Sequence, residues 1–135
     1  MNDIGYSTRA YASQDRLAKM FQLREEFMKA IREKRGAYGE WPVDIGDKKS
    51  QQMLREITLK GVEEMFEALG ELKNWKSHRV TEDRNVNRDA FLEEIVDAFN
   101  YFFAVLILSG VDADELFNAY LKKNAVIHDR LNNNY

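Results

Sequence analysis

The segment that decides the fold runs from Arg88 to Leu108 and reads RDAFLEEIVDAFNYFFAVLIL. After Ile95 it is apolar on almost every side, which is typical of the central helix of a bundle. Its longest apolar stretch begins at Ala98 and is interrupted by Asn100. This stretch is about half the roughly 20 residues that a membrane-spanning helix needs. We therefore predict a core helix in an all-α fold.

The rest of the chain also shows helical periodicity. One proline and seven glycines divide 135 residues into long segments without strand alternation. We expect a first helix from Ser13, as its N-cap, to about Lys34, and a second from about Lys48 to Trp75. A further helix should begin at Asp112, which can form a capping-box-like pair with Glu115.

Composition and charge narrow the class of protein. With 44% hydrophobic and 32% charged residues, we expect one folded domain over residues 1–135. The absence of cysteine excludes disulfides, thiolate metal sites and a cysteine nucleophile. The first residues lack the apolar core of a secretory signal, so we expect a cytoplasmic protein. A net charge of −3 gives no basic field for nucleic acid, and we expect neither nucleic-acid nor membrane partners.

Two acidic pairs stand out as candidates for chemistry. Glu64 and Glu67 are three residues apart on one predicted helix, and Glu94 and Asp97 are three apart on another. Side chains at this spacing project from neighbouring turns and can converge on one cation. Asp97 lies within the most apolar segment, so we expect it to be nearly buried and to need a metal or a basic partner. The alternatives are a solvated face for the first pair and an ion pair with lysine or arginine for Asp97.

Four carboxylates on two packed helices would supply the oxygen ligands that Mg²⁺ prefers. Zinc is not expected, because His78 and His128 lie far from these pairs and lack metal-ligand spacing. A magnesium site fits phosphoryl chemistry, in which the ion neutralises phosphate oxygens and acidifies a water. Lys122, Lys123 and Arg130 could add positive charge for a polyphosphate. The alternative is that these three residues have no role in binding and only give the helix a basic C-terminal end, which the helix dipole favours.

These residues resemble the all-α NTP pyrophosphatases, which include the dimeric dUTPases and the MazG-type enzymes. That family's pattern is similar to E-x-x-E followed by E-x-x-D, which here is EEMFE, ending at Glu67, and EIVD, ending at Asp97. Three segments look most like the dUTPase branch and its viral relatives. They are KNWK at 73–76, EEIVDAFNYFF at 93–103 and YLKKN at 120–124. The resemblance covers about residues 54–135.

The resemblance implies a four- to five-helix bundle that hydrolyses dUTP to the monophosphate and pyrophosphate in nucleotide-pool control. It implies Mg²⁺ bound by the four acidic residues, with Glu64 or Glu67 also acting on the attacking water. It further implies phosphate contacts from three residues of the last helix, Lys123, Asn124 and Arg130. We expect Asn100 to contact the base and Trp75 to stack on it, the alternative being a core or interface tryptophan.

The sequence leaves open which nucleotide is the substrate and whether the protein is an enzyme. The family often has histidine at the position of Asn100, asparagine at that of Ile127 and glutamine near Arg24, so dCTP or a purine dNTP is the alternative nucleoside triphosphate. From another class, the chain would be a non-catalytic helical oligomerisation or binding module.

The predicted helix at 88–108 has more apolar surface than three neighbouring helices cover, so we expect a homo-oligomer, a dimer or a tetramer.

Overall fold

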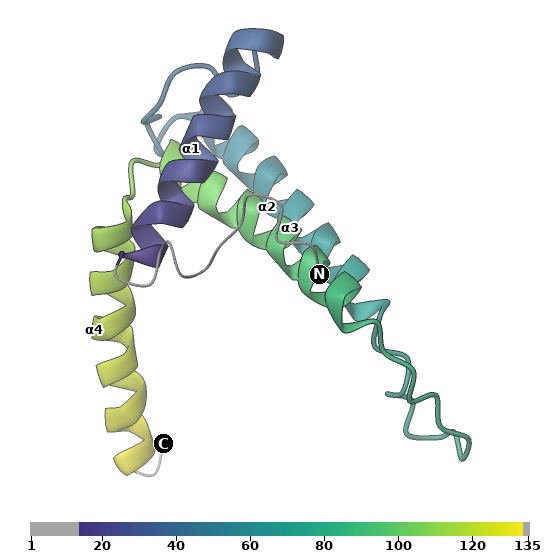
Figure 1. Cartoon of the computed structure of the whole chain (residues 1–135). Helices are drawn as coiled ribbons and strands as arrows, with labels where there is room; N and C mark the ends of the chain where they lie inside the picture. The colour runs from purple at the N-terminus through teal and green to yellow at the C-terminus, as the bar shows by residue number, and fades with distance from the viewer. Residues whose placement is uncertain (1–13, 134–135) are drawn as a thin grey trace. The chain divides into compact units, whose positions relative to one another are not determined.

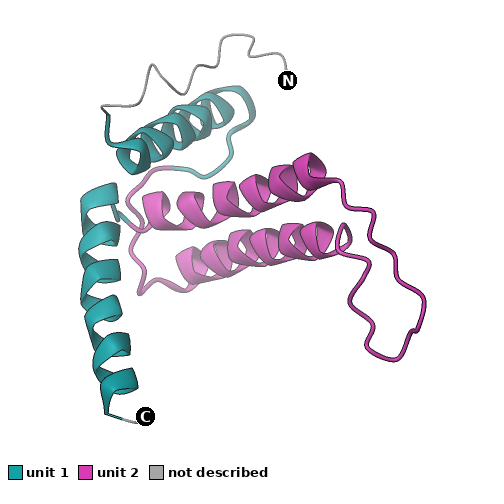
Figure 2. Ribbon diagram, turned by 60° about the horizontal axis from the view of Figure 1, so that its bottom comes forward, with its two compact units in different colours: residues 1–39, 110–135 teal, residues 40–109 magenta. Residues whose placement is uncertain are grey.

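The computed structural model describes residues 14–133, which form four α-helices and no strand (Figure 1). The helices are α1 (Arg16–Arg35), α2 (Lys48–Leu69), α3 (Arg88–Leu108) and α4 (Ala113–Asn132). This confirms the all-α class. The chain divides into two compact units, one holding α1 and α4 and the other, residues 40–109, holding α2 and α3 (Figure 2). That all 135 residues act as one functional domain stays a prediction.

Every helix begins behind an acidic or amide side chain that accepts a hydrogen bond from a first-turn backbone N–H. The O···N distances are 2.9–3.0 Å at the four caps, Asp15, Asp47, Asn87 and Asp112. The cap predicted at Asp112 is therefore confirmed, with Glu115 donating its N–H. Ser13 lies outside the described residues, and the observed cap of α1 is Asp15. Gly36 ends α1 at a φ of +69°, a conformation that glycine adopts without strain.

The second helix is shorter than the sequence indicates. It ends at Leu69, whereas helical periodicity predicts an end near Trp75. Gly70 follows, and glycine has the poorest helix propensity apart from proline. The next two N–H groups, of Glu71 and Leu72, donate to carbonyls only three residues back, at 3.1 and 3.0 Å. This tight turn stops the helix. Trp75 therefore belongs to the α2–α3 connection, residues 70–87.

Helices α2 and α3 lie side by side and run antiparallel (Figures 1 and 2). Small residues are among the buried ones of both helices: Gly61 and Ala68 of α2 and Ala98 and Ala104 of α3. The far end of α3 is anchored at Leu108, which is fully buried and whose carbonyl accepts the N–H of Val43 at 2.8 Å. Most of the buried residues of α3 lie in its second half, and that α3 is the central helix of a bundle stays a prediction.

In the other unit, α1 and α4 contact each other less extensively than α2 and α3 do. Phe21 and Met28 are the buried residues of α1, and Ala113 is the buried residue of α4. Most of α4 is exposed, including large apolar side chains. No helix in the described part of the chain combines the length and apolarity needed to cross a membrane.

Candidate metal centre

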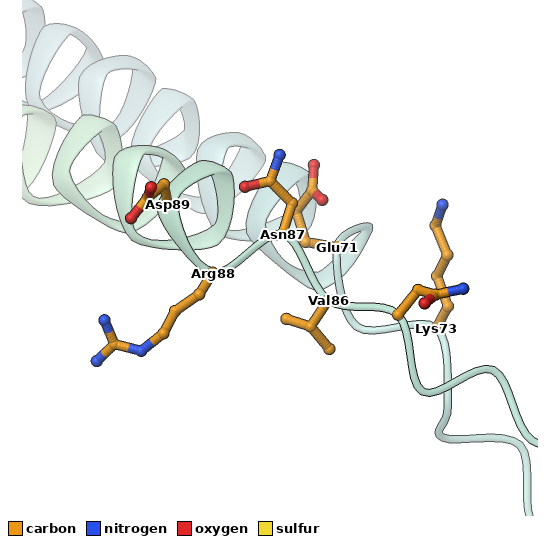
Figure 3. A pocket seen from close by; sticks show the side chains of 7 residues that line it. Glu71, Lys73, Val86, Asn87, Arg88 and Asp89 are labelled. Carbon is orange, nitrogen blue, oxygen red and sulfur yellow. The ribbon is translucent and has the colours of Figure 1, made fainter. Parts of the chain in front are cut away.

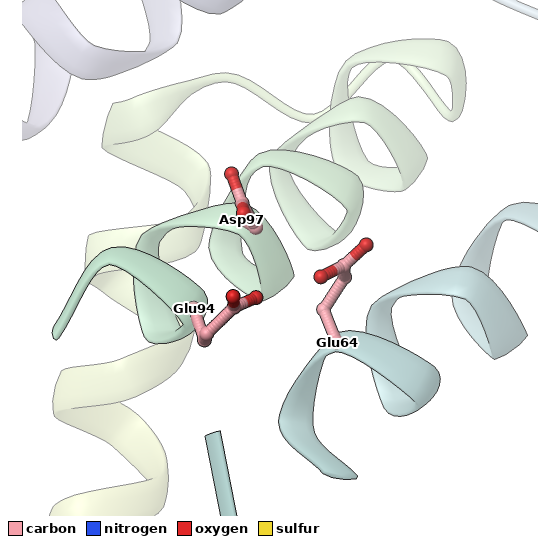
Figure 4. Close-up of side chains that lie close together, drawn as sticks. All are labelled: Glu64, Glu94 and Asp97. Carbon is pink, nitrogen blue, oxygen red and sulfur yellow. The ribbon is translucent and has the colours of Figure 1, made fainter. Parts of the chain in front are cut away.

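Three acidic side chains converge where α2 faces the first half of α3. Glu64 of α2 and Glu94 and Asp97 of α3 each offer one carboxylate oxygen, and these oxygens all lie within 4.8 Å of one another (Figure 4). We call this group the acidic trio. All three members are partly exposed to solvent. A cation could reach all three carboxylates without displacing core side chains.

Local sequence explains the position of each member. Glu94 and Asp97 are three residues apart on α3, so their side chains leave the helix from adjacent turns on one side. Glu64 lies between Gly61 and Ala68 on α2, both of which are buried against α3. Glu64 is therefore at the edge of the packed α2 face, where a longer side chain can reach across to α3.

The trio is electrostatically crowded. Loss of hydration raises the pKa of Glu94 above its ordinary value of 4.5, and a side-chain hydrogen bond with Glu64 raises it further. Like-charge repulsion from Glu64, Asp97 and Glu67 acts in the same direction. Within residues 14–133, no lysine or arginine forms an ion pair with a member of the trio. No basic side chain in this range therefore neutralises the excess negative charge by an ion pair.

Glu67, the fourth predicted ligand, lies one turn beyond Glu64 on α2 and is exposed. It is not a member of the trio, although it is near enough to raise the pKa of Glu94. The structure thus brings three of the four predicted carboxylates together directly and places the fourth at their margin. That all four bind metal stays a prediction.

The expectation that Asp97 is nearly buried is wrong. Two of its apolar neighbours, Val96 and Phe99, are 48% and 49% exposed, so the apolar segment around Asp97 does not enclose it. Ala98, in contrast, is fully buried. The requirement for a positive partner at this site therefore comes from the crowding of carboxylates and not from burial of Asp97.

The remaining predicted site residues lie elsewhere. Asn100 is half-buried on α3, one turn beyond Asp97, so it follows the trio along the same helix. Trp75 is 71% exposed in the α2–α3 connection, with the Lys76 Nζ 5.7 Å from its ring centroid. Three residues belong to α4, in the other unit, and are exposed: Lys123, Asn124 and Arg130. Their contacts with substrate stay predictions.

The α2–α3 connection also carries a surface hollow that sequence reasoning missed. Its volume is about 560 Å³, and it is lined by residues from both ends of the connection (Figure 3). Lys73 and Arg88 oppose Glu71 and Asp89 in charge among these lining residues. In Figure 3 the Arg88 side chain points away from Glu71 and Asn87. The hollow therefore lacks a set of convergent groups, and none of the trio lines it.

Comparison with known proteins finds no relative. No family model matches the chain, and no curated protein or solved structure matches it. The resemblance to the all-α NTP pyrophosphatases therefore stays a prediction. Over residues 14–133 the structure shows four helices and no strand, with three converging carboxylates on α2 and α3.

Proposed function

We propose that this protein is a magnesium-dependent hydrolase of a deoxynucleoside triphosphate, with dUTP as the first candidate and the monophosphate and pyrophosphate as products. The observation that carries the proposal is the convergence of Glu64, Glu94 and Asp97 from two helices within 4.8 Å. The sequence spacing of the two acidic pairs supports it independently, because it matches the pattern of the all-α NTP pyrophosphatases. The cellular role would be control of the nucleotide pool.

The donor set favours a hard divalent cation. All three groups are carboxylates, and oxygen ligands suit Mg²⁺, whereas zinc sites usually include histidine or cysteine. The trio also gathers up to three negative charges and forms no ion pair with a lysine or arginine of residues 14–133, so a divalent cation would relieve the repulsion between them. Mg²⁺ keeps several water ligands in most protein sites, and the partial exposure of the trio leaves room for these waters and for substrate oxygens.

In this proposal, the trio and Glu67 hold one or two Mg²⁺ ions. When bound, Mg²⁺ would neutralise phosphate oxygens and make a nearby water more acidic. Glu64 or Glu67 orients the attacking water and accepts its proton. The exposed position of Glu67 beside the trio suits this role, because its carboxylate is free to contact water.

Substrate binding is assigned to residues outside the trio. Lys123, Asn124 and Arg130 would contact the phosphates through positive charge and amide hydrogen bonds. Asn100 would bind a base edge, since it both donates and accepts and follows Asp97 by one turn of α3. The exposed indole of Trp75 would stack on the base.

The direct test measures pyrophosphate release from each dNTP, with Mg²⁺ and with EDTA. We expect Mg²⁺-dependent turnover, greatest with dUTP, and its loss in Asp97→Asn. Glu93→Gln is the matched control, because Glu93 is exposed on α3 but outside the trio. Turnover of dCTP or a purine dNTP instead would keep the chemistry and change the substrate. No turnover of any nucleotide would refute the proposal.

A second candidate is a non-catalytic oligomerisation or binding module. It is favoured by the apolar side chains of α4 that are more than half exposed: Phe117, Tyr120, Leu121, Ile127 and Leu131. Such a module would keep its binding activity in Glu94→Gln, whereas the hydrolase would lose turnover. Both candidates predict a homo-oligomer, a dimer or a tetramer, that covers apolar surface. A strictly monomeric species in light scattering at micromolar concentration would contradict that expectation.

A further inference from the structure

Gly61 and Phe102 meet at the closest approach of α2 and α3. Gly61 is buried on α2, and the Phe102 ring lies where its side chain would begin. A Cβ atom at position 61 would be 2.5 Å from Cε1, 2.9 Å from Cδ1 and 3.1 Å from Cζ of that ring. Carbon atoms in contact are ordinarily about 3.5–4.0 Å apart. Even alanine therefore does not fit without movement of the ring or of a helix.

Helix propensity does not explain a glycine at this position. Gly61 lies in the interior of α2, where glycine is less favourable than alanine. Backbone conformation does not require it either, unlike Gly36 and Gly39, which have φ values of +69° and +62° and nothing within 4 Å of an added Cβ. The requirement for glycine at position 61 comes from its partner on α3.

This contact is the immediate neighbour of the acidic trio. Gly61 precedes Glu64 by three residues on α2, and Phe102 follows Asp97 by five on α3. Because the two helices are antiparallel, the Gly61–Phe102 contact and the Glu64–Glu94 contact are successive along one interface. Ala98, fully buried, lies between Asp97 and Phe102. A change in helix spacing at Gly61 would therefore lie within one helical turn of Glu64.

We propose that Gly61 is a positioning residue for the metal centre. Its missing side chain admits the Phe102 ring and keeps α2 near enough to α3 for Glu64 to share a cation with Glu94 and Asp97. The role in metal binding rests on the proposed function, whereas the effect on the spacing of the carboxylates does not. A Cβ at position 61 separates Glu64 from the two ligands on α3 and leaves the ligands themselves unchanged.

The test compares Mn²⁺ binding, measured by electron paramagnetic resonance, in the wild type and Gly61→Ala. We expect affinity to fall about 10- to 100-fold, as for other residues that orient metal ligands. Adding Phe102→Leu, which removes Cε1 and Cζ of the ring, should restore affinity to within about threefold of Phe102→Leu alone. Phe99→Leu, on the exposed side of α3, is the control for loss of a ring and should bind normally.

Crystal structures of the metal-free wild type and Gly61→Ala supply a readout that does not depend on metal. We expect the oxygens of Glu64, Glu94 and Asp97 to lie within 4.8 Å of one another only in the wild type. If the wild type does not bind Mn²⁺, the proposed function fails, and these structures alone decide the role of Gly61. If Gly61→Ala does not fold, the double variant decides, because it must match Phe102→Leu. Unchanged affinity in folded Gly61→Ala, failure of the rescue, or an unchanged trio would overturn the inference.

Discussion

Replacing Glu94 by glutamine should raise the stability of the metal-free protein. Three carboxylates within 4.8 Å of one another form three pairs of like charges. Glu94→Gln keeps the size of the side chain and removes two of these three repulsions, those with Glu64 and with Asp97. The surroundings of Glu94 also raise its pKa, so its negative charge is unfavourable in the folded protein. At neutral pH and with EDTA, the variant should melt above the wild type.

With magnesium the order should reverse. A ligand that binds only the folded state at 100 times its Kd stabilises it by about 2.7 kcal/mol. For a chain of 135 residues this is a rise in Tm on the order of 10 °C. A neutral amide is a poorer ligand for Mg²⁺ than a carboxylate, so Glu94→Gln should lose most of this rise. The two melting curves should therefore exchange order as Mg²⁺ is added.

The assay is thermal unfolding followed by circular dichroism, with EDTA and with MgCl₂, and with KCl added to match ionic strength. Glu93→Gln is the control, because it removes the same charge from the adjacent, exposed position on α3. It should change the metal-free Tm little and keep the full response to Mg²⁺. If both variants respond alike, or if Mg²⁺ does not shift the wild type, the reasoning from the trio is refuted.

Three further predictions concern pH, capping and substrate. Because the pKa of Glu94 is raised in the folded protein, the free energy of unfolding of the metal-free protein should fall as pH rises through that pKa, while Mg²⁺ affinity should increase. A ¹³C titration of the carboxyl groups measures this, and the dependence of stability on pH should be unchanged in the control variant Glu93→Gln. Asp47→Ala removes the oxygen that accepts the Ser50 N–H at 3.0 Å, so urea unfolding should show a loss of about 1 kcal/mol, and no loss would contradict the capping role. Lys123→Ala should raise KM for the nucleotide and leave Mn²⁺ affinity unchanged. A rise in KM together with a fall in Mn²⁺ affinity would instead place Lys123 at the metal centre.

The helices could be predicted because their signals are local. Apolar periodicity and the cap at Asp112 lie within a few residues of the structure that they specify. The end of α2 was missed because apolar residues continue in helical register beyond Gly70, although the backbone has already changed to a tight turn. Periodicity alone therefore extended the helix into the α2–α3 connection.

The acidic site was only partly predictable for a related reason. Spacing places Glu94 and Asp97 on one side of a helix, whatever that helix packs against. Burial of Asp97 depended instead on which neighbours cover α3, and Val96 and Phe99 remain half exposed. The approach of Gly61 to Phe102 is likewise a tertiary contact between residues far apart in sequence. A glycine inside a helix signals close approach, but nothing in the sequence identifies the ring that approaches it.

The predicted metal ligands and the predicted phosphate contacts lie in different units of the chain. Every member of the trio, and the Gly61–Phe102 contact beside it, belongs to residues 40–109. The predicted phosphate contacts on α4 belong to the other unit. Mg²⁺ affinity should therefore depend on the spacing of α2 and α3 and not on the side chains of α4, whereas the proposed hydrolysis should respond to substitutions in either unit. A protein that binds Mg²⁺ but turns over no nucleotide would preserve the metal centre and refute the proposed hydrolase function.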